Sequence, residues 1–125
     1  MTSAIADIEE LQASLLRSLA SRHRLRILHL LAEGSCEVNE LARELGLSQA
    51  ATSQHLGAMR RAGLVDSVRE GRTQRYAVAD PQILAACGLM REVLVRRLSR
   101  MGDLAAAASA SPAEPVSAAS EATRE

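Results

Sequence analysis

The side chains in this sequence that could do chemistry are a few thiols, imidazoles and carboxylates. His29 and Glu33 stand four residues apart, so on a helix they would lie one turn from each other and could share a metal ion. The candidate ligands for a divalent transition metal such as nickel or zinc are His23, His29, Glu33, Cys36, Asp80 and Cys87. Histidines also serve in packing or capping, and free cysteine is commonly a small buried hydrophobe, so a structural role stays open for each candidate.

The two cysteines, Cys36 and Cys87, could instead form a redox or persulfide switch. No lysine or arginine adjacent in the sequence lowers the pKa of Cys36, and the neighbouring Glu37 would raise it. Two cysteines are too few for the disulfide framework that replaces a core in small secreted domains. Because no nucleophile with a base and no pair of carboxylates is evident, we expect a binding protein and not an enzyme.

Residues 48–76 indicate a different chemistry, the binding of nucleic acid. No acid occurs at residues 49–64, and glutamine and serine side chains in that stretch can hydrogen-bond to base edges. Over residues 48–76, five arginines stand against two acids, a local net charge of +3. The expected base contacts are Gln49, Ser53 and Gln54, and the expected DNA-backbone contacts are Ser48, His55, Arg60, Arg61, Arg69, Arg72 and Arg75.

The composition of the whole chain hides this basic segment. The 125 residues carry 15 basic and 15 acidic side chains, so the formal net charge is zero. This length predicts one domain, and a chain with a single aromatic residue must build an aliphatic core, which favours packed helices. No apolar stretch reaches the roughly 18 residues of a membrane span, so we expect a soluble, cytoplasmic protein without a membrane partner.

The hydrophobic pattern predicts five helices and one two-stranded hairpin. The predicted helices cover residues 5–19, 25–31, 38–45, 49–62 and 81–101, and the hairpin covers residues 64–78. Gly34 and Gly46 would end the second and third helices in a left-handed conformation, and Ser48 would cap the fourth. We place the folded domain at residues 1–101 and expect residues 102–125, rich in alanine, serine and proline, to be a disordered tail.

The first and last helices carry apolar stripes that predict a subunit interface. The expected interface residues are Ile8, Leu11, Leu15, Cys87, Met90, Leu94 and Leu98. Their spacing by three or four residues places them on one side of each helix. We therefore expect a homodimer joined through these two helices.

The order of elements is that of a winged helix-turn-helix, a mainly α fold with a small β-hairpin. The turn is Leu45-Gly46-Leu47-Ser48. Glycine at position 46 permits the backbone to reverse, Leu47 can fill the angle between the helices, and Ser48 can accept hydrogen bonds from free amides of the next helix. Those amides also favour a DNA phosphate at the helix N-terminus.

These segments resemble the ArsR/SmtB family of bacterial transcription regulators. The resemblance rests on residues 41–56 (LARELGLSQAATSQHL) and 59–65 (MRRAGLV), with support from residues 19–28 and from Tyr76 followed by Asp80-Pro81. It implies a homodimer that binds an inverted-repeat operator in double-stranded DNA. Family members usually repress a neighbouring operon and leave the DNA when an inducer binds.

The inducer sites of the family are not preserved. Where one family site has a Cys-Val-Cys triplet, residues 37–39 read Glu-Val-Asn, with Cys36 one residue outside. In a second family site Asp80 fits the first position, but Gln82, Val93 and Arg96 occupy the others, and arginine is not a ligand. The positions of the family's thiol switch hold His29 and Val95.

The expected function is therefore that of a dimeric DNA-binding regulator that could respond to a metal ion or a thiol-reactive inducer. Two alternatives keep the same fold. In one, a separate sensor protein supplies the response, or the domain is a protein-interaction module. In the other, the six candidate ligands form a metal or thiol site unlike those of the relatives.

Overall fold

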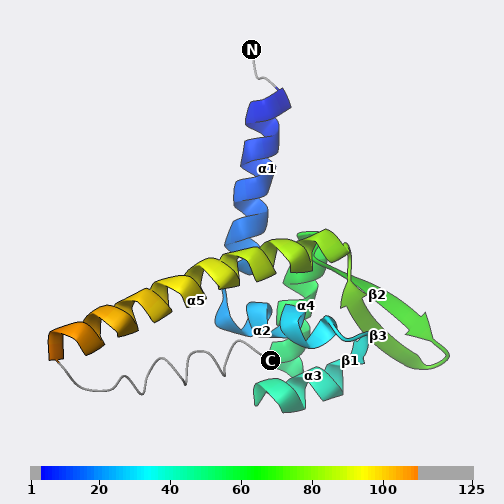
Figure 1. The fold of residues 1–125 in the computed structure, drawn as a ribbon. Coiled ribbons are helices and arrows are strands. Elements are labelled where there is room, and N and C mark those ends of the chain that lie inside the picture. The colour runs from blue at the N-terminus through cyan, green and yellow to red at the C-terminus, as the bar shows by residue number, and fades with distance from the viewer. Residues whose placement is uncertain (1–3, 110–125) are drawn as a thin grey trace. The chain divides into compact units, whose positions relative to one another are not determined.

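The computed structural model of the protein describes residues 4–109, which form five helices and a small antiparallel sheet (Figure 1). In chain order the elements are α1 (Ala4–Leu19), α2 (Arg22–Leu31), β1 (Cys36–Glu37), α3 (Val38–Leu45), α4 (Gln49–Arg61), β2 (Val65–Glu70), β3 (Thr73–Val78) and α5 (Pro81–Ser109). The chain divides after Leu84 into two units. The predicted fold of five helices with a β-hairpin between the fourth and fifth is confirmed.

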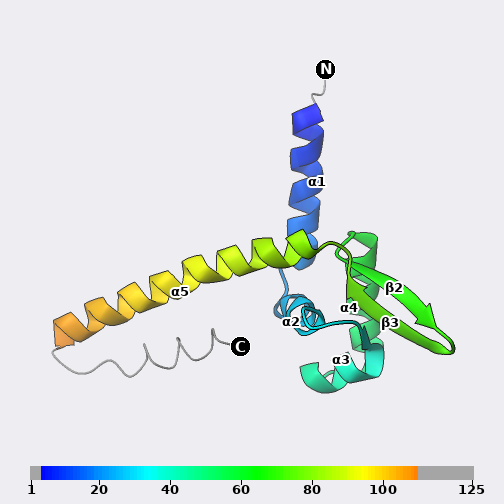
Figure 2. The same cartoon turned by 45° about the vertical axis from the view of Figure 1, so that its right-hand side comes forward.

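The core of the first unit lies among α2, α3, α4 and the sheet, which Figure 2 shows grouped together. Its buried side chains are Ile27, Leu28, Leu31, Leu41, Ala42, Thr52, Leu56, Met59, Leu64 and Val65. All are aliphatic except Met59 and Thr52, and the Thr52 hydroxyl donates to the carbonyl oxygen of Ser48 at 2.9 Å, so its burial leaves no unpaired donor. The aliphatic core expected from the composition is confirmed.

Helices α3 and α4 are joined by the tight turn that the sequence predicts. Gly46 ends α3 at φ 69° and ψ 31°, a left-handed conformation that a residue with a Cβ rarely adopts. The amide of Leu47 then donates to the carbonyl oxygen of Ala42 at 3.0 Å, which closes the end of α3. Ser48 caps α4, because its Oγ accepts from the amide of Ala51 at 3.0 Å. These bonds hold the start of α4 at a defined angle to α3.

The sheet has three strands in the order β1-β3-β2, all antiparallel. The two-stranded wing predicted from residues 64–78 is present, but the prediction missed the third strand, β1. Strand β1 pairs Cys36 with Tyr76 and Glu37 with Arg75. A strand of two residues carries no alternating pattern of its own, and only its partner β3, far along the chain, shows that it exists. The hairpin turn itself forms around Gly71 at φ 63°.

Helix α5 is longer than predicted. It runs to Ser109 and so continues through residues 102–109, which were expected to belong to a disordered tail. The alanines at positions 105–108 have the highest helix propensity of any residue, and this outweighs the cost of Gly102. The remainder of the predicted tail, residues 110–125, lies outside the described residues.

The end of α2 also differs from the prediction. The helix stops at Leu31 with Ala32 as its right-handed C-cap, and Gly34, at φ 139°, follows two residues later instead of forming a left-handed cap. Over residues 4–109 no helix combines the length and apolar character that a bilayer crossing requires.

Candidate nucleic-acid interface

Helix α4 has two contrasting faces. Thr52, Leu56 and Met59 are buried, as the spacing predicts, and fix the helix against the core. Gln49, Ser53 and Gln54 are exposed on the other side, in a helix without an acidic residue. An exposed face of neutral amides and hydroxyls can exchange hydrogen bonds with base edges without repelling phosphates.

The N-terminal half of α4 lies next to the hairpin across a groove of about 390 Å³. The groove is lined by Glu37, Val38, Asn39, Gln49, Ser53, Arg72, Thr73, Gln74 and Tyr76. Two of the predicted base contacts, Gln49 and Ser53, and one predicted wing contact therefore face the same space, although Arg72 lies 19 residues after Ser53 in the sequence. Asn39, Thr73 and Gln74 also line the groove and were not predicted as contacts, because only the pairing of the strands brings these polar side chains beside α4.

The other predicted cations lie outside the groove lining. Arg60 and Arg61 are exposed in the last turn of α4, and Arg69 is exposed on β2. Arg72, which does line the groove, lies next to the hairpin turn and is exposed as well. Long exposed arginine side chains of this kind can reach phosphates on either side of a bound duplex.

His55 is placed differently from the other predicted DNA contacts. It is half-buried, and its Nδ1 accepts a hydrogen bond of 3.1 Å from Nε of Arg24 on α2. Its ring also lies beside that of His23, with 5.6 Å between the ring centroids. Burial lowers the pKa of His55, and the nearby Arg24 and His23 lower it further. His55 thus has partners inside the protein.

Arg75 likewise has partners inside the protein. Its Nη2 donates to the carbonyl oxygen of Ser35 at 2.7 Å, and its Nε donates to Ser35 Oγ at 2.9 Å. Carboxylate oxygens of Glu37, Glu40 and Glu70 lie 3.7, 3.8 and 3.9 Å from its guanidinium nitrogens. The sequence grouped Arg75 with Arg72 because both flank the same turn, but only Arg72 lines the groove.

The candidate metal ligands do not converge within the described residues of one chain. Over that part of the protein no three histidine, cysteine or acidic side chains come close enough to hold a metal ion. Burial raises the pKa of both Cys36 and Cys87, and Glu40 raises that of Cys36 further. A raised pKa keeps a thiol protonated and so less reactive as a ligand or nucleophile.

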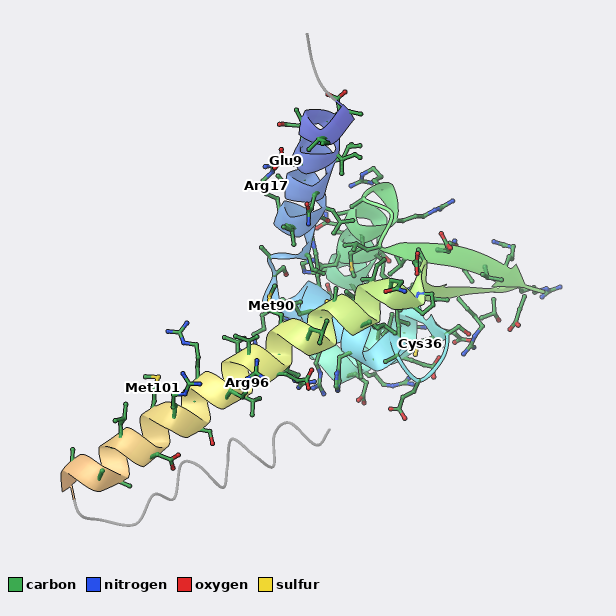
Figure 3. All side chains as sticks on the ribbon, turned by 45° about the horizontal axis from the view of Figure 1, so that its top comes forward. Glu9, Arg17, Cys36, Met90, Arg96 and Met101 are labelled. Carbon is green, nitrogen blue, oxygen red and sulfur yellow. The ribbon has the colours of Figure 1, made fainter. Side chains whose placement is uncertain are left out.

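Each unit presents apolar side chains to solvent where the subunit interface was predicted. On α1, Ile8 and Leu11 are 61% and 70% exposed. On α5, Met90, Leu94 and Leu98 are exposed, and Figure 3 shows Met90 and Met101 projecting from this helix. Leu15 and Cys87 are half-buried. Apolar surface of this extent is typical of a face that another subunit covers.

The fold and this surface together define a winged helix-turn-helix DNA-binding protein. Comparison with known proteins agrees. The sequence pattern of the family described as "Bacterial regulatory protein, arsR family" matches residues 21–67. The HTH-type transcriptional regulator Rv0081 of Mycobacterium tuberculosis is 41% identical over 91 residues, which cover 72% of this chain and 80% of that protein. Its crystal structure aligns with a TM-score of 0.70 at 39% identity, over 75% of this chain and 95% of that one.

Two further relatives carry informative names. The HTH-type transcriptional regulator CmtR of M. tuberculosis is 41% identical over 87 residues, covering 70% of this chain and 74% of that protein. Its NMR structure, described as a cadmium metal-sensor, aligns with a TM-score of 0.54 at 45% identity, over 61% of this chain and 79% of that one. A homodimeric winged helix-turn-helix DNA-binding domain of Mycobacterium bovis aligns with a TM-score of 0.74 at 30% identity, over 80% and 93% of the two chains.

The chain belongs to the arsR family of bacterial regulatory proteins and is a DNA-binding transcriptional regulator. The predicted resemblance, fold class and general function are confirmed. The family is one of DNA-binding regulators and not a class of enzymes.

Proposed function

We propose that this protein binds an inverted-repeat operator as a homodimer and represses transcription from it. It works in the bacterial cytoplasm, and it acts by binding and not by catalysis. The observation that carries the proposal is the groove that Gln49 and Ser53 of α4 share with Arg72 of the wing. A duplex that enters this space with its major groove toward α4 meets base-reading amides and hydroxyls on one side and a guanidinium on the other.

The exposed side chains divide into two roles. Gln49, Ser53 and Gln54 contact base edges, because amides and hydroxyls can both donate and accept hydrogen bonds there. The residues that hold the DNA backbone are Ser48, Arg60, Arg61, Arg69 and Arg72. His55 contributes to DNA binding indirectly: it holds α4 in place through its hydrogen bond to Arg24 and does not contact a phosphate itself.

The homodimer is supported by the exposed apolar side chains of α1 and α5 and by the M. bovis relative, whose DNA-binding domain is homodimeric. A two-fold symmetric protein matches a two-fold symmetric site. We therefore expect operator half-sites separated by about one helical turn of DNA, roughly 10 base pairs, or by a multiple of it.

A divalent metal ion is the effector class that the relatives favour, since CmtR is described as a cadmium metal-sensor. In this chain the candidate ligands remain His23, His29, Glu33, Cys36, Asp80 and Cys87. The described residues of one protomer bring no three acidic, histidine or cysteine side chains together, so a complete site would require groups from both protomers of the dimer. An operator-binding assay with added effectors distinguishes a metal ion from a thiol reagent and from a separate sensor protein.

Fluorescence anisotropy with a duplex from upstream of the protein's own gene tests the proposal. Wild-type protein should bind tightly at low salt and more weakly at high salt, because phosphate contacts release counterions. Arg72→Ala should weaken binding to all sequences, whereas Gln54→Ala should relax the preference at particular base pairs. Arg17→Ala, which removes the same charge from the exposed surface of α1, is the matched control and should bind as the wild type does.

Additions to the same assay identify the effector. Release by nickel, zinc or cadmium would support metal sensing, and release by an oxidant would support a thiol switch. Binding that no additive changes would move sensing to a separate protein. Failure of the wild type to bind any duplex at low salt would contradict the proposed function.

A further inference from the structure

Arg75 lies in the wing but does not face the DNA groove. Its neighbours Gln74 and Tyr76 both line the groove, and Arg75 between them is not among the lining residues. Successive side chains of a strand point to opposite faces of a sheet, so Arg75 projects from the face of β3 opposite to that of Gln74 and Tyr76. It shares this face with its cross-strand partner Glu37, which itself lines the groove. Its position in the sequence therefore gives a misleading impression of its role.

On that other face, Arg75 contacts the segment that leads into α3. Two of its nitrogens donate to a single residue, Ser35, which directly precedes β1: Nη2 to the carbonyl oxygen at 2.7 Å and Nε to Oγ at 2.9 Å. Two donors in a fixed planar fork, matched to two acceptors of one residue, define an orientation as well as a distance. The guanidinium thus connects β3 with a segment 40 residues earlier in the chain.

The charges around Arg75 also disfavour a phosphate partner. Glu37 and Glu40 approach it from β1 and α3, at 3.7 and 3.8 Å, and Glu70 approaches from β2 at 3.9 Å. A phosphate drawn toward this guanidinium would meet three carboxylates. The Arg75 side chain is only 27% exposed, whereas Arg69 and Arg72 are exposed and form no ion pair with the described residues.

The contacts of Arg75 lie where the short strand β1 pairs with β3. Strand β1 contributes only two residues, so few ladder hydrogen bonds attach the wing to the segment before α3. Glu40, one of the carboxylates near Arg75, also accepts from the amide of Glu37 at 2.9 Å and so completes the capping box of α3. Arg75 therefore joins the wing to the start of the helix-turn-helix.

We propose that Arg75 is a positioning residue for operator binding, which holds the wing against Ser35 and the start of α3 so that Arg72 stays opposite Gln49 and Ser53. This inference rests on the proposed function, because it assigns a role in the same DNA-binding groove. It replaces the direct DNA-backbone contact expected for Arg75 from the sequence.

Ser35→Ala is the variant that separates positioning from phosphate contact. It removes the Oγ acceptor without changing any charge and leaves the Arg75 side chain intact. If Arg75 positions the wing, Ser35→Ala should weaken operator binding about threefold with an unchanged dependence of log K on log salt. If Arg75 contacts phosphate, releasing it from Ser35 should leave the affinity equal or raise it, and that result would overturn the proposal.

Two further variants complete the experiment. Arg72→Ala should reduce the slope of log K against log salt concentration by about one, since it removes a phosphate contact. Arg75→Gln should weaken binding about tenfold with a smaller change of slope, and adding Ser35→Ala to it should weaken binding no further, as expected for two residues that act through one contact. A loss of about one slope unit in Arg75→Gln, equal to that of Arg72→Ala, would overturn the proposal.

Thermal melting of each variant separates positioning from a purely structural role. A purely structural role would lower the melting temperature and leave the operator affinity of the folded Ser35→Ala protein unchanged, which would also overturn the proposal. Wild-type protein that binds no DNA would overturn the proposed function together with this inference. If the wild type binds DNA and Ser35→Ala binds it with the same affinity, this inference alone is overturned.

Discussion

Nε of Arg24 donates to Nδ1 of His55 across 3.1 Å and so joins α2 to the middle of α4. The same guanidinium donates from Nη1 to the carbonyl oxygen of Ser18, near the end of α1, at 2.9 Å. Three helices of the first unit therefore meet at one arginine. Because an arginine only donates, Nδ1 of His55 must carry a lone pair, and the neutral ring holds its proton at Nε2.

The surroundings of His55 make the stability of the protein depend on pH. The pKa of His55 is lowered by burial first and then by Arg24 and His23, so the folded state binds this proton less readily than the unfolded chain does. The unfolded histidine titrates near pH 6.5. The free energy of unfolding should therefore be retained above about pH 6.5 and fall as the pH drops through the lowered pKa of His55.

Urea unfolding at about pH 7.5 and about pH 5.5, compared between wild type and His55→Gln, measures this effect. Glutamine does not titrate but still offers an oxygen to Arg24. The wild type should lose more stability on acidification than the variant, since all other titrating groups are common to both proteins. An equal loss in the two proteins would show that His55 does not contribute.

The cap residue Ser48 should matter for the stability of the protein as well as for DNA binding, whereas Ser53 on the outer face of α4 should matter for DNA binding alone. Ser48→Ala removes the acceptor of the Ala51 amide and should cost about 1 kcal/mol in the free energy of unfolding. Ser53→Ala changes a serine of the same helix that is exposed, and should leave stability within about 0.5 kcal/mol while reducing operator affinity. Chemical denaturation and anisotropy on both variants would contradict this division if Ser53→Ala proved the more destabilising.

The buried side of α4 should be sensitive to loss of volume. Leu56 is fully buried, so Leu56→Ala should destabilise the domain by about 2 to 5 kcal/mol through lost burial and a residual cavity. Val68 on the wing is half exposed, and Val68→Ala should cost less than about 1 kcal/mol. Thermal unfolding followed by circular dichroism compares the two, and similar melting temperatures would argue against the described core.

The exposed apolar face of α1 should decide the oligomeric state. Leu11→Glu places a charge where we expect the partner subunit, and should shift the protein toward a monomer with weaker operator binding. Gln12→Glu adds the same charge one residue away, at an exposed polar position, and should remain dimeric. Sedimentation velocity at micromolar concentration distinguishes the two, and a dimeric Leu11→Glu protein would place the interface elsewhere.

Much of the first unit could be predicted because its signals are local. Gly46 and Ser48 specify the turn through their own backbone and side-chain preferences, and the spacing of Thr52, Leu56 and Met59 alone defines the inner face of α4. The general function followed from the same short segment, since an amphipathic helix with an acid-free outer face is suited to DNA.

The tertiary structure decided the features that depend on contacts between distant residues. His55 and Arg24 are 31 residues apart, and Ser35 and Arg75 are 40 apart, so no local pattern connects either pair. Strand β1 exists only because β3 pairs with it. Sequence spacing could assign Arg72 and Arg75 to one group, but the pleat of the strand and the position of Ser35 give these two arginines different surroundings.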